Sequence, residues 1–343
     1  MTVTNTRQIQ YKDALIESLT QEMQRDPTVF VMGEDIAGGA GRAHLGITEA
    51  WGGPFGLTKG LIQQFGPSRV RDTPISEGGF LGTAIGAALT GFRPVIDLMY
   101  MDFVGVCFDQ LISNAAKIRY MMGGQAKVPL TIFTRFGAGT GNAAQHSSIY
   151  YGILSHIPGL KVVVPSDPYT LKGLLLSAIR DDDPVIVCND KKLIKMSGAV
   201  PDHPYTLPIG ESRIPLEGQD LTLVGIGYTT QLCLEAAQTL QSLGVKPEVV
   251  DLLSLSPLDK ETVLQSVRKT NRLVIVDEDT PRCGIATDIA AIVVDEAFDF
   301  LDAPIKRVTA PHTPVPYSKP LEDHYLPSSE KIVRITKELL NRL

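Results

Sequence analysis

The residues with most potential for chemistry lie in the segment RDTPISEGGFLGTAIGAALTGFRPVIDLMYMDF, residues 71–103. Its opening places Ser76 and Glu77 where a helix is expected to begin. The free N–H groups and positive dipole end of a helix favour an acid there, so a capping glutamate is the simplest interpretation. The expected helix then carries four small residues: Gly82, Gly86, Ala87 and Gly91.

This surface of small residues would let a neighbouring helix or subunit approach closely. Glu77 would then lie at a crowded junction. A carboxylate buried there must be paired or hydrogen-bonded, because otherwise its pKa rises until the group is neutral. Glu77 is therefore a candidate functional acid as well as a candidate cap.

A second candidate is His146, at the end of the loop TRFGAGTGNAAQHS (residues 134–147). The loop follows an expected strand, and its glycines 137, 139 and 141 do not match the G-x-G-x-x-G pattern of dinucleotide sites. It is interpreted as a flexible or strained loop with a titratable group. Such loops at strand ends are common places for catalytic groups, since a rigid scaffold positions them.

Two further patterns have ordinary explanations. Gly225 and Gly227 follow an expected strand, with Asp251 further along, but the third glycine of a nicotinamide-binding fingerprint is absent. The acidic run Asp181–Asp183 could bind a cation or could form a solvated turn before Pro184. Both interpretations of the acidic run stay open.

The elements that must position these residues follow an alternating pattern. Short runs rich in Val and Ile alternate with longer segments of helical period, which predicts an α/β fold with mostly parallel sheets flanked by helices. The strands expected in the first half are Val29–Met32, Val95–Leu98, Leu130–Thr134, Leu160–Val164 and Val185–Cys188. The helices expected there are Tyr11–Arg25, Gly79–Thr90, Phe103–Met121 and Tyr169–Arg180.

The chain is expected to form two domains. Its 343 residues exceed the usual size of one core. The pattern dissolves into a segment rich in Pro and Gly at 196–219, which is interpreted as a linker. The boundaries are therefore predicted as a first domain at 1–195, the linker at 196–219, and a smaller α/β domain at 220–343.

Composition excludes several classes of function. A net charge of −6 and the lack of a basic stripe argue against nucleic acid as a partner. The longest small apolar stretch, residues 78–92, is too short to cross a bilayer.

The four cysteines lie far apart and form no C-x-x-C, so reduced thiols are expected. With no signal or transit pattern in the first 19 residues, the cytoplasm is the expected location.

Taken together, these segments resemble the β subunit of the thiamine-diphosphate-dependent decarboxylating component of 2-oxo acid dehydrogenase complexes. The resemblance covers nearly the whole chain. Its landmarks, in order, are GEDI at 33–36, KGL at 59–61, DTPISE at 72–77, AAQHS at 143–147, PGLKVVVPSDP at 158–168, AIRDDDPV at 178–185, PHTPVPYS at 311–318 and LEDHYLPS at 321–328. The resemblance implies a transketolase-like pyrimidine-binding domain followed by a transketolase C-terminal-like domain.

Within this family, AWGGPFGLTKGL, MDFVGVCFDQ and PRCGIATDIA look most like acetoin dehydrogenase. Pyruvate and branched-chain 2-oxo acid dehydrogenase β subunits share the landmarks and remain alternatives. Ser148 stands where family members more often carry Gln, and the Gly-rich loop before His146 is unusual. These departures concern the identity of the small-molecule substrate.

The resemblance also implies roles for particular residues. Glu77 would hydrogen-bond the aminopyrimidine ring nitrogen, Phe103 would stack on that ring, and Met99 would lie nearby. His146 would steady the reacting oxygen or the incoming lipoyl group. A turn that binds potassium in some relatives corresponds here to Leu130, Ala178, Ile179, Asp181 and Asp183.

The cofactor is expected to be shared between subunits. In the family, thiamine diphosphate generates a carbanion with its own amino group as base, and a carboxylate at the opposite ring nitrogen favours the required imino form. The diphosphate is normally anchored by a GDG sequence with Mg²⁺, and this chain contains no GDG. The resemblance therefore implies an α subunit that holds Mg²⁺ and the diphosphate, an α2β2 heterotetramer, and a lipoyl-bearing acyltransferase as acceptor of the two-carbon unit. A non-catalytic scaffold subunit is the rival interpretation.

Overall fold

The computed structural model describes residues 6–38 and 50–340. Within these residues the first half of the chain is built on a seven-stranded sheet of order β12-β6-β7-β5-β4-β2-β3. The strands are β2 (Val29–Glu34), β3 (Val70–Thr73), β4 (Arg93–Tyr100), β5 (Thr131–Phe136), β6 (Lys161–Val163), β7 (Val185–Asp190) and β12 (Ser254–Ser256). All neighbours are parallel except β12, which pairs antiparallel with β6. The prediction of a mostly parallel sheet is confirmed.

Helices cover both faces of this sheet, because the strands are apolar on both sides. In β2, Val29 and Val31 belong to one buried cluster, whereas Phe30 and Met32 belong to another. The first cluster contains side chains of α1 (Tyr11–Arg25) and α7 (Pro168–Arg180), and the second contains those of α3 (Glu77–Leu89) and α4 (Val104–Asp109). The shorter helices are α2 (Leu61–Phe65), α5 (Ile118–Met121) and α6 (Tyr151–Ser155).

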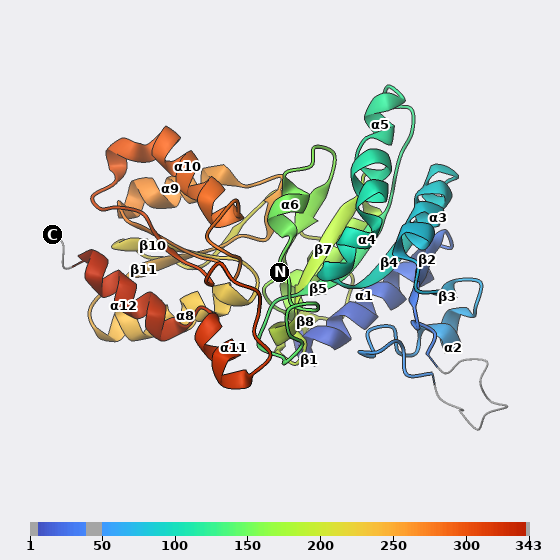
Figure 1. The fold of residues 1–343 in the computed structure, drawn as a ribbon, viewed down its shortest axis with the longest axis horizontal. Helices are drawn as coiled ribbons and strands as arrows, with labels where there is room; N and C mark the ends of the chain where they lie inside the picture. The colour runs from blue at the N-terminus through green and yellow to red at the C-terminus, as the bar shows by residue number, and fades with distance from the viewer. Residues whose placement is uncertain (1–5, 39–49, 341–343) are drawn as a thin grey trace.

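The second half forms a five-stranded sheet of order β14-β13-β10-β11-β9 within the described residues. Its strands are β9 (Arg213–Leu216), β10 (Leu221–Gly225), β11 (Pro247–Asp251), β13 (Leu273–Val276) and β14 (Lys306–Val308). Its helices are α8 (Tyr228–Ser242), α9 (Lys260–Thr270), α10 (Ile285–Ala297), α11 (Lys319–Tyr325) and α12 (Ser329–Leu340). Figure 1 shows this half beside the first, with α9 and α10 on one side of the sheet and α8 and α12 on the other.

The segment that was expected to be a linker contains two strands. One is β8 (Ser197–Pro201), which pairs antiparallel with β1 (Thr6–Gln10), and the other is β9, which joins the edge of the second sheet. Both are short strands in antiparallel pairs, where Pro and Gly are tolerated more readily than in a central strand. The sequence pattern therefore gave little sign of them.

The two halves share one apolar cluster. The cluster that contains α3 and α4 continues through Val224 and Val250 of the second sheet to Ile285 of α10. In addition, β12 lies beyond residue 220 in sequence but belongs to the first sheet. The predicted division at 195 and 220 stays a prediction, while the packing across it is continuous.

The segment expected to be one helix from Phe103 to Met121 is interrupted. It begins with a 3-10 turn at Met101–Phe103, continues as α4, and then widens into a π-helical turn at Gln110–Ala115 before α5. Cys107 has non-helical dihedrals inside α4, and such interruptions often accompany functional sites. None of the described helices combines the length and apolar character needed to span a membrane.

Candidate functional site

Glu77 is a buried carboxylate at the first residue of α3. Its side chain is only 6% exposed, and no described residue donates a hydrogen bond to the carboxylate or forms an ion pair with it. Burial, with smaller contributions from Asp35 and then Glu77, raises the pKa of Glu34. Burial and the Glu77 charge together raise the pKa of the Cys107 thiol to about 12. A buried carboxylate with no cation beside it favours a ligand that brings a hydrogen-bond donor.

The small residues of α3 accommodate the next helical segment of the same chain. A Cβ on Gly78 would lie 3.4 Å from the Val106 carbonyl oxygen, and one on Gly82 would lie 3.1 Å from Gln110 Oε1. A Cβ on Gly86 would meet nothing within 4 Å. The close approach inferred from the sequence is therefore made by α4 and the π-helical turn, while the surface is open at Gly86 and at Gly91, beyond the end of α3.

Met99 adopts a backbone conformation that is rare for its residue type. Its φ is +59°, and the pairing of β4 with β5 shifts register between Asp97 and Tyr100. Asp97 Oδ1 accepts a hydrogen bond from Met99 N at 2.8 Å, and Arg135 Nε donates one to Met99 O at 3.0 Å. Both backbone groups of Met99 are thus held, which stabilises a conformation that is otherwise costly.

The charges that hold Met99 are themselves buried. Arg135 is 1% exposed, and its guanidinium lies 3.2 Å from the centre of the Phe55 ring. Burial lowers the pKa of Arg135 to about 10 despite the nearby Asp97 charge. Burial also raises the pKa of Asp97, although Arg135 and the bond from Met99 oppose this. Neither residue was recognised from the sequence: Asp97 lies inside an expected strand, and Arg135 was placed in the loop 134–147, whereas in the structure it belongs to β5.

Phe103 and His146 come together around Tyr100. The ring centroids of Tyr100 and His146 are 4.6 Å apart, those of Phe103 and His146 are 5.8 Å apart, and those of Tyr100 and Phe103 are 5.7 Å apart. All three contacts are edge-to-face, the arrangement that aromatic quadrupoles favour. The structure therefore brings together two residues from segments 43 positions apart that the sequence had singled out separately.

Lys191 fixes the end of the loop that carries His146. Its Nζ donates hydrogen bonds to the His146 carbonyl, to Ser147 Oγ at 3.1 Å, and to Asn142 Oδ1 at 3.3 Å. Burial lowers the pKa of Lys191 to about 8, opposed most strongly by the Asp102 charge. A lysine that donates three bonds in a largely buried setting restrains the loop at this end.

The residues expected to bind potassium are already paired with cationic side chains. Lys161 Nζ lies 2.7 Å from Asp181 Oδ2 and 3.3 Å from Asp183 Oδ2, and Arg119 also pairs with Asp183. Arg93 donates to the carbonyl of Ile179, while the carbonyls of Leu130 and Ala178 accept backbone N–H groups. Among the described residues, no group of three or more His, Cys, Asp or Glu could hold a metal. The Asp181 and Asp183 carboxylates are thus paired with cationic side chains, and the potassium site stays a prediction from the resemblance.

A cavity of about 500 Å³ lies beside the His146 loop, between the two halves. Ser147, Ser148 and Tyr150 line it from the first half. The acidic run Asp277–Asp279, with Tyr325 and Cys283, approaches it from the second half, and Glu278 and Asp279 line it directly. This acidic group was not recognised from the sequence, because its members follow β13 as an ordinary strand-end turn.

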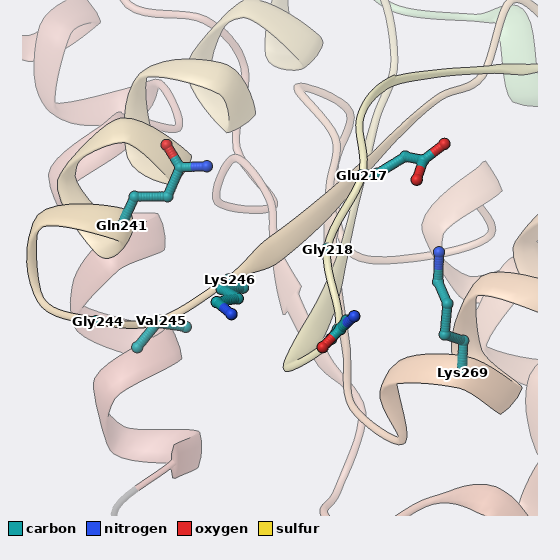
Figure 2. A pocket seen from close by; sticks show the side chains of 8 residues that line it. Glu217, Gly218, Gln241, Gly244, Val245, Lys246 and Lys269 are labelled. Atoms are coloured by element: carbon teal, nitrogen blue, oxygen red, sulfur yellow. The ribbon is translucent and has the colours of Figure 1, made fainter.

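Another cavity, of about 530 Å³, lies away from these residues. Figure 2 shows Glu217, Lys246 and Lys269 around it, at the amino ends of β10 and β11. Lys269 is paired with Glu248. This cavity contains none of the residues that the sequence singled out.

Comparisons with known proteins agree on the architecture. The transketolase pyrimidine binding domain matches residues 7–196, and the transketolase C-terminal domain matches residues 210–332. A solved structure described as a split gene transketolase, inactive β4 tetramer, superposes with a TM-score of 0.77 over 97% of this chain and 98% of that chain. Its sequence identity is 22%, so this likeness concerns the fold alone.

Curated relatives are similar over nearly their full length. The acetoin:2,6-dichlorophenolindophenol oxidoreductase subunit beta of Bacillus subtilis (strain 168) is 55% identical over 97% of this chain and 98% of the relative. The subunit of the same name from Cupriavidus necator is 51% identical with the same coverage. The pyruvate dehydrogenase E1 component subunit beta of Rickettsia felis is 43% identical over 97% of this chain and 98% of the relative.

Buried acids near the cavity give a testable pH dependence. Burial, reinforced by the Asp277 charge, raises the pKa of Asp279 from 3.8 to about 7. The folded chain therefore keeps a proton that the unfolded chain loses between pH 4 and 7, so this contribution to stability is complete below pH 4 and is lost as the pH rises through 7.

We expect the thermal midpoint of the purified chain to fall between pH 5 and pH 8, as measured by differential scanning fluorimetry. In Asp279→Asn the fall should shrink by several degrees, because a pKa of about 7 in place of 3.8 corresponds to about 2–3 kcal/mol between pH 5 and pH 8. Asp299→Asn, at an exposed position, is the control and should leave the fall unchanged. An equal fall in Asp279→Asn and in the unsubstituted chain would contradict the assignment.

Proposed function

The chain belongs to the family of transketolase-like β subunits that includes those of acetoin and pyruvate dehydrogenases, and we propose that it contributes Glu77 to a thiamine-diphosphate site shared with an α subunit. The observation that carries this proposal is the buried Glu77 carboxylate, which has no donor or cation partner among the described residues. An aminopyrimidine supplies the missing donor, so the residues present fit this cofactor.

The chain's own residues have distinct tasks in this proposal. Thiamine diphosphate, when bound, supplies a carbanion that attacks a carbonyl and accepts the electrons of the cleaved carbon–carbon bond. Glu77 holds a proton at the ring nitrogen, because a carboxylate in a water-poor site interacts strongly with such a donor. Phe103 and Met99 present half-buried apolar groups for the ring to pack on. His146, in contact with Tyr100 and Phe103, holds or donates a proton at the reacting oxygen.

The partner subunit covers the side of the molecule near Glu77. Ile75 and Val106 are 77% and 66% exposed, and they flank Glu77 and Phe103 in sequence. Exposed apolar side chains beside a buried functional acid favour a protein partner there. The partner would hold Mg²⁺ and the diphosphate, for which this chain has no GDG sequence, in an α2β2 assembly.

Acetoin is the substrate that the relatives favour. The two relatives named for acetoin are 55% and 51% identical to this chain, against 43% for the pyruvate dehydrogenase subunit. The proposed reaction cleaves acetoin and passes the two-carbon unit to the lipoyl group of an acyltransferase partner. Pyruvate is the alternative substrate. The cytoplasm is the proposed compartment, since all four cysteines are free thiols.

The central test is Glu77→Gln in the enzyme assembled with its α subunit. Gln removes the negative charge with little change in size, so we expect turnover to fall by about 100-fold or more while the assembly keeps its size on gel filtration. Glu330→Gln is the matched control, since Glu330 lies in the first turn of α12 but is exposed. Near-normal turnover of Glu77→Gln would favour the scaffold interpretation.

Cofactor binding should depend on the partner. We expect the isolated chain to bind thiamine diphosphate weakly in calorimetric titrations with Mg²⁺, because the diphosphate has no anchor on this chain. Addition of the α subunit should give tight binding. Tight, magnesium-dependent binding by the chain alone would contradict a shared site.

The substrate can be identified by steady-state assays of the coexpressed pair with an artificial electron acceptor. Acetoin should give the highest kcat/KM among acetoin, pyruvate and branched-chain 2-oxo acids. A higher kcat/KM for pyruvate would instead support the alternative substrate. The ratio of the two kcat/KM values measures the difference in transition-state binding between acetoin and pyruvate.

A further inference from the structure

The glycines before His146 form a backbone cradle for carboxylates. Gly137, Gly139 and Gly141 have φ of +95°, +95° and +69°. Alternating residues with positive φ point successive N–H groups toward one side of the loop, and such a concave array of N–H groups attracts anions. The loop that the sequence indicated to be flexible or strained is therefore shaped for a negatively charged group.

Two glutamates of the second half occupy this cradle. Glu278 Oε1 accepts a hydrogen bond from Ala138 N at 2.5 Å. Glu322, in α11, accepts from Gly139 N at 2.6 Å and from Gly141 N at 3.1 Å. Both glutamates are only 2% exposed. Hydrogen bonds to a buried carboxylate are stronger than those between neutral groups, so the cradle ties the loop firmly to the second half.

The loop backbone at Gly137 and Gly139 lies too close to neighbouring side chains for a residue larger than glycine. A Cβ on Gly137 would lie 2.9 Å from Glu278 Oε1, and one on Gly139 would lie 2.9 Å from Lys192 Cδ. Lys192 Nζ in turn lies 2.9 Å from Glu278 Oε2, which partly balances the charge of that carboxylate. Glycine at position 137 thus allows both the positive φ and the close contact with Glu278 of the second half, and glycine at position 139 allows the positive φ and leaves room for Lys192.

The same loop carries His146 and is held at its other end by Lys191, through the His146 carbonyl and Asn142. The segment between the two attachment points is short, from Gly141 to His146. Release of the cradle would free residues 137–141 from the second half and leave the part of the loop that carries His146 held by Lys191 alone, so the imidazole would lose support for its place against Tyr100 and Phe103.

We propose that Glu322 is a positioning residue for His146. Through the Glu322 carboxylate, the second half of the chain fixes the position of the His146 side chain, which acts in the first half. The inference rests on the proposed function only for the role of His146. The attachment itself follows from the hydrogen bonds of Glu322 to Gly139 and Gly141.

The test uses Glu322→Gln in the assembled enzyme, with hydrogen–deuterium exchange of the peptide that contains residues 134–147 as the first readout. Gln replaces two charged acceptor oxygens by one neutral oxygen and an NH₂ group that cannot accept, which weakens the hydrogen bonds from Gly139 and Gly141, so exchange of this peptide should become at least about 10-fold faster. Turnover should fall by between about 10-fold and 100-fold, because misplacement of a catalytic group by about 1 Å has effects of this size. Affinity for thiamine diphosphate should stay unchanged, since the hydrogen bonds of Glu322 are made to the Gly-rich loop and none of them involves Glu77.

Asp323→Asn is the matched control, since Asp323 lies on the same helix but is exposed and forms an ion pair with Lys319. It should change neither exchange nor turnover. If Glu322→Gln fails to assemble, Gly139→Ala provides a second variant, because its Cβ and its φ both oppose the cradle and should give the same two effects.

Unchanged exchange in Glu322→Gln would overturn the attachment, and faster exchange with normal turnover would overturn the positioning role. These outcomes differ from the failure of the proposed function, which would appear as full activity of Glu77→Gln whatever the exchange of the loop.

Discussion

Buried carboxylates of the second half depend on donors from the first, and this dependence joins the two halves of the chain. Asp277 accepts a bond from Tyr151, and Asp251 accepts one from Ser166 Oγ at 2.6 Å. Glu278 and Glu322 accept from the Gly-rich loop. An ionised carboxylate that leaves water without such partners costs several kcal/mol. Separation of the halves would therefore expose an apolar cluster and remove these donors from the acids at the same time.

The candidate site combines several features that ordinary packing avoids. Met99 has a positive φ, Arg135 and Asp97 are buried charges, and Glu77 has no partner among the described residues. Each feature costs stability by itself, and each persists because the surrounding sheet and helices hold it in place. Such local conflicts are expected where a protein binds or reacts rather than where it only folds. Their concentration between β4, α3 and the His146 loop supports one site formed by several segments.

The local sequence pattern was sufficient to predict the central strands and helices, but it was insufficient to predict the strands at the edges of the sheets. The helix Tyr11–Arg25 was predicted with its observed bounds, since its apolar positions repeat with helical period. By contrast, β3 was missed because VRDT is half charged, and β8 and β9 were taken for a linker. An edge strand buries little surface, so its sequence carries little of the pattern that identifies a central strand. The single helix expected at 103–121 was wrong in another way, because Cys107 has non-helical dihedrals and the following turn, Gln110–Ala115, is π-helical.

The sequence by itself determined the α/β class, the acid at the start of a helix, and the glycines whose spacing allows a cradle. It also placed Phe103 and His146 among the candidates, since their motifs are short and local. Only the tertiary structure decided what these residues meet: Glu322 lies 183 positions from Gly139, and Tyr151 lies 126 positions from Asp277. Hydrogen bonds across such separations leave no periodic trace in the chain, because the sheet order rather than the neighbouring residues brings the donor to the acceptor.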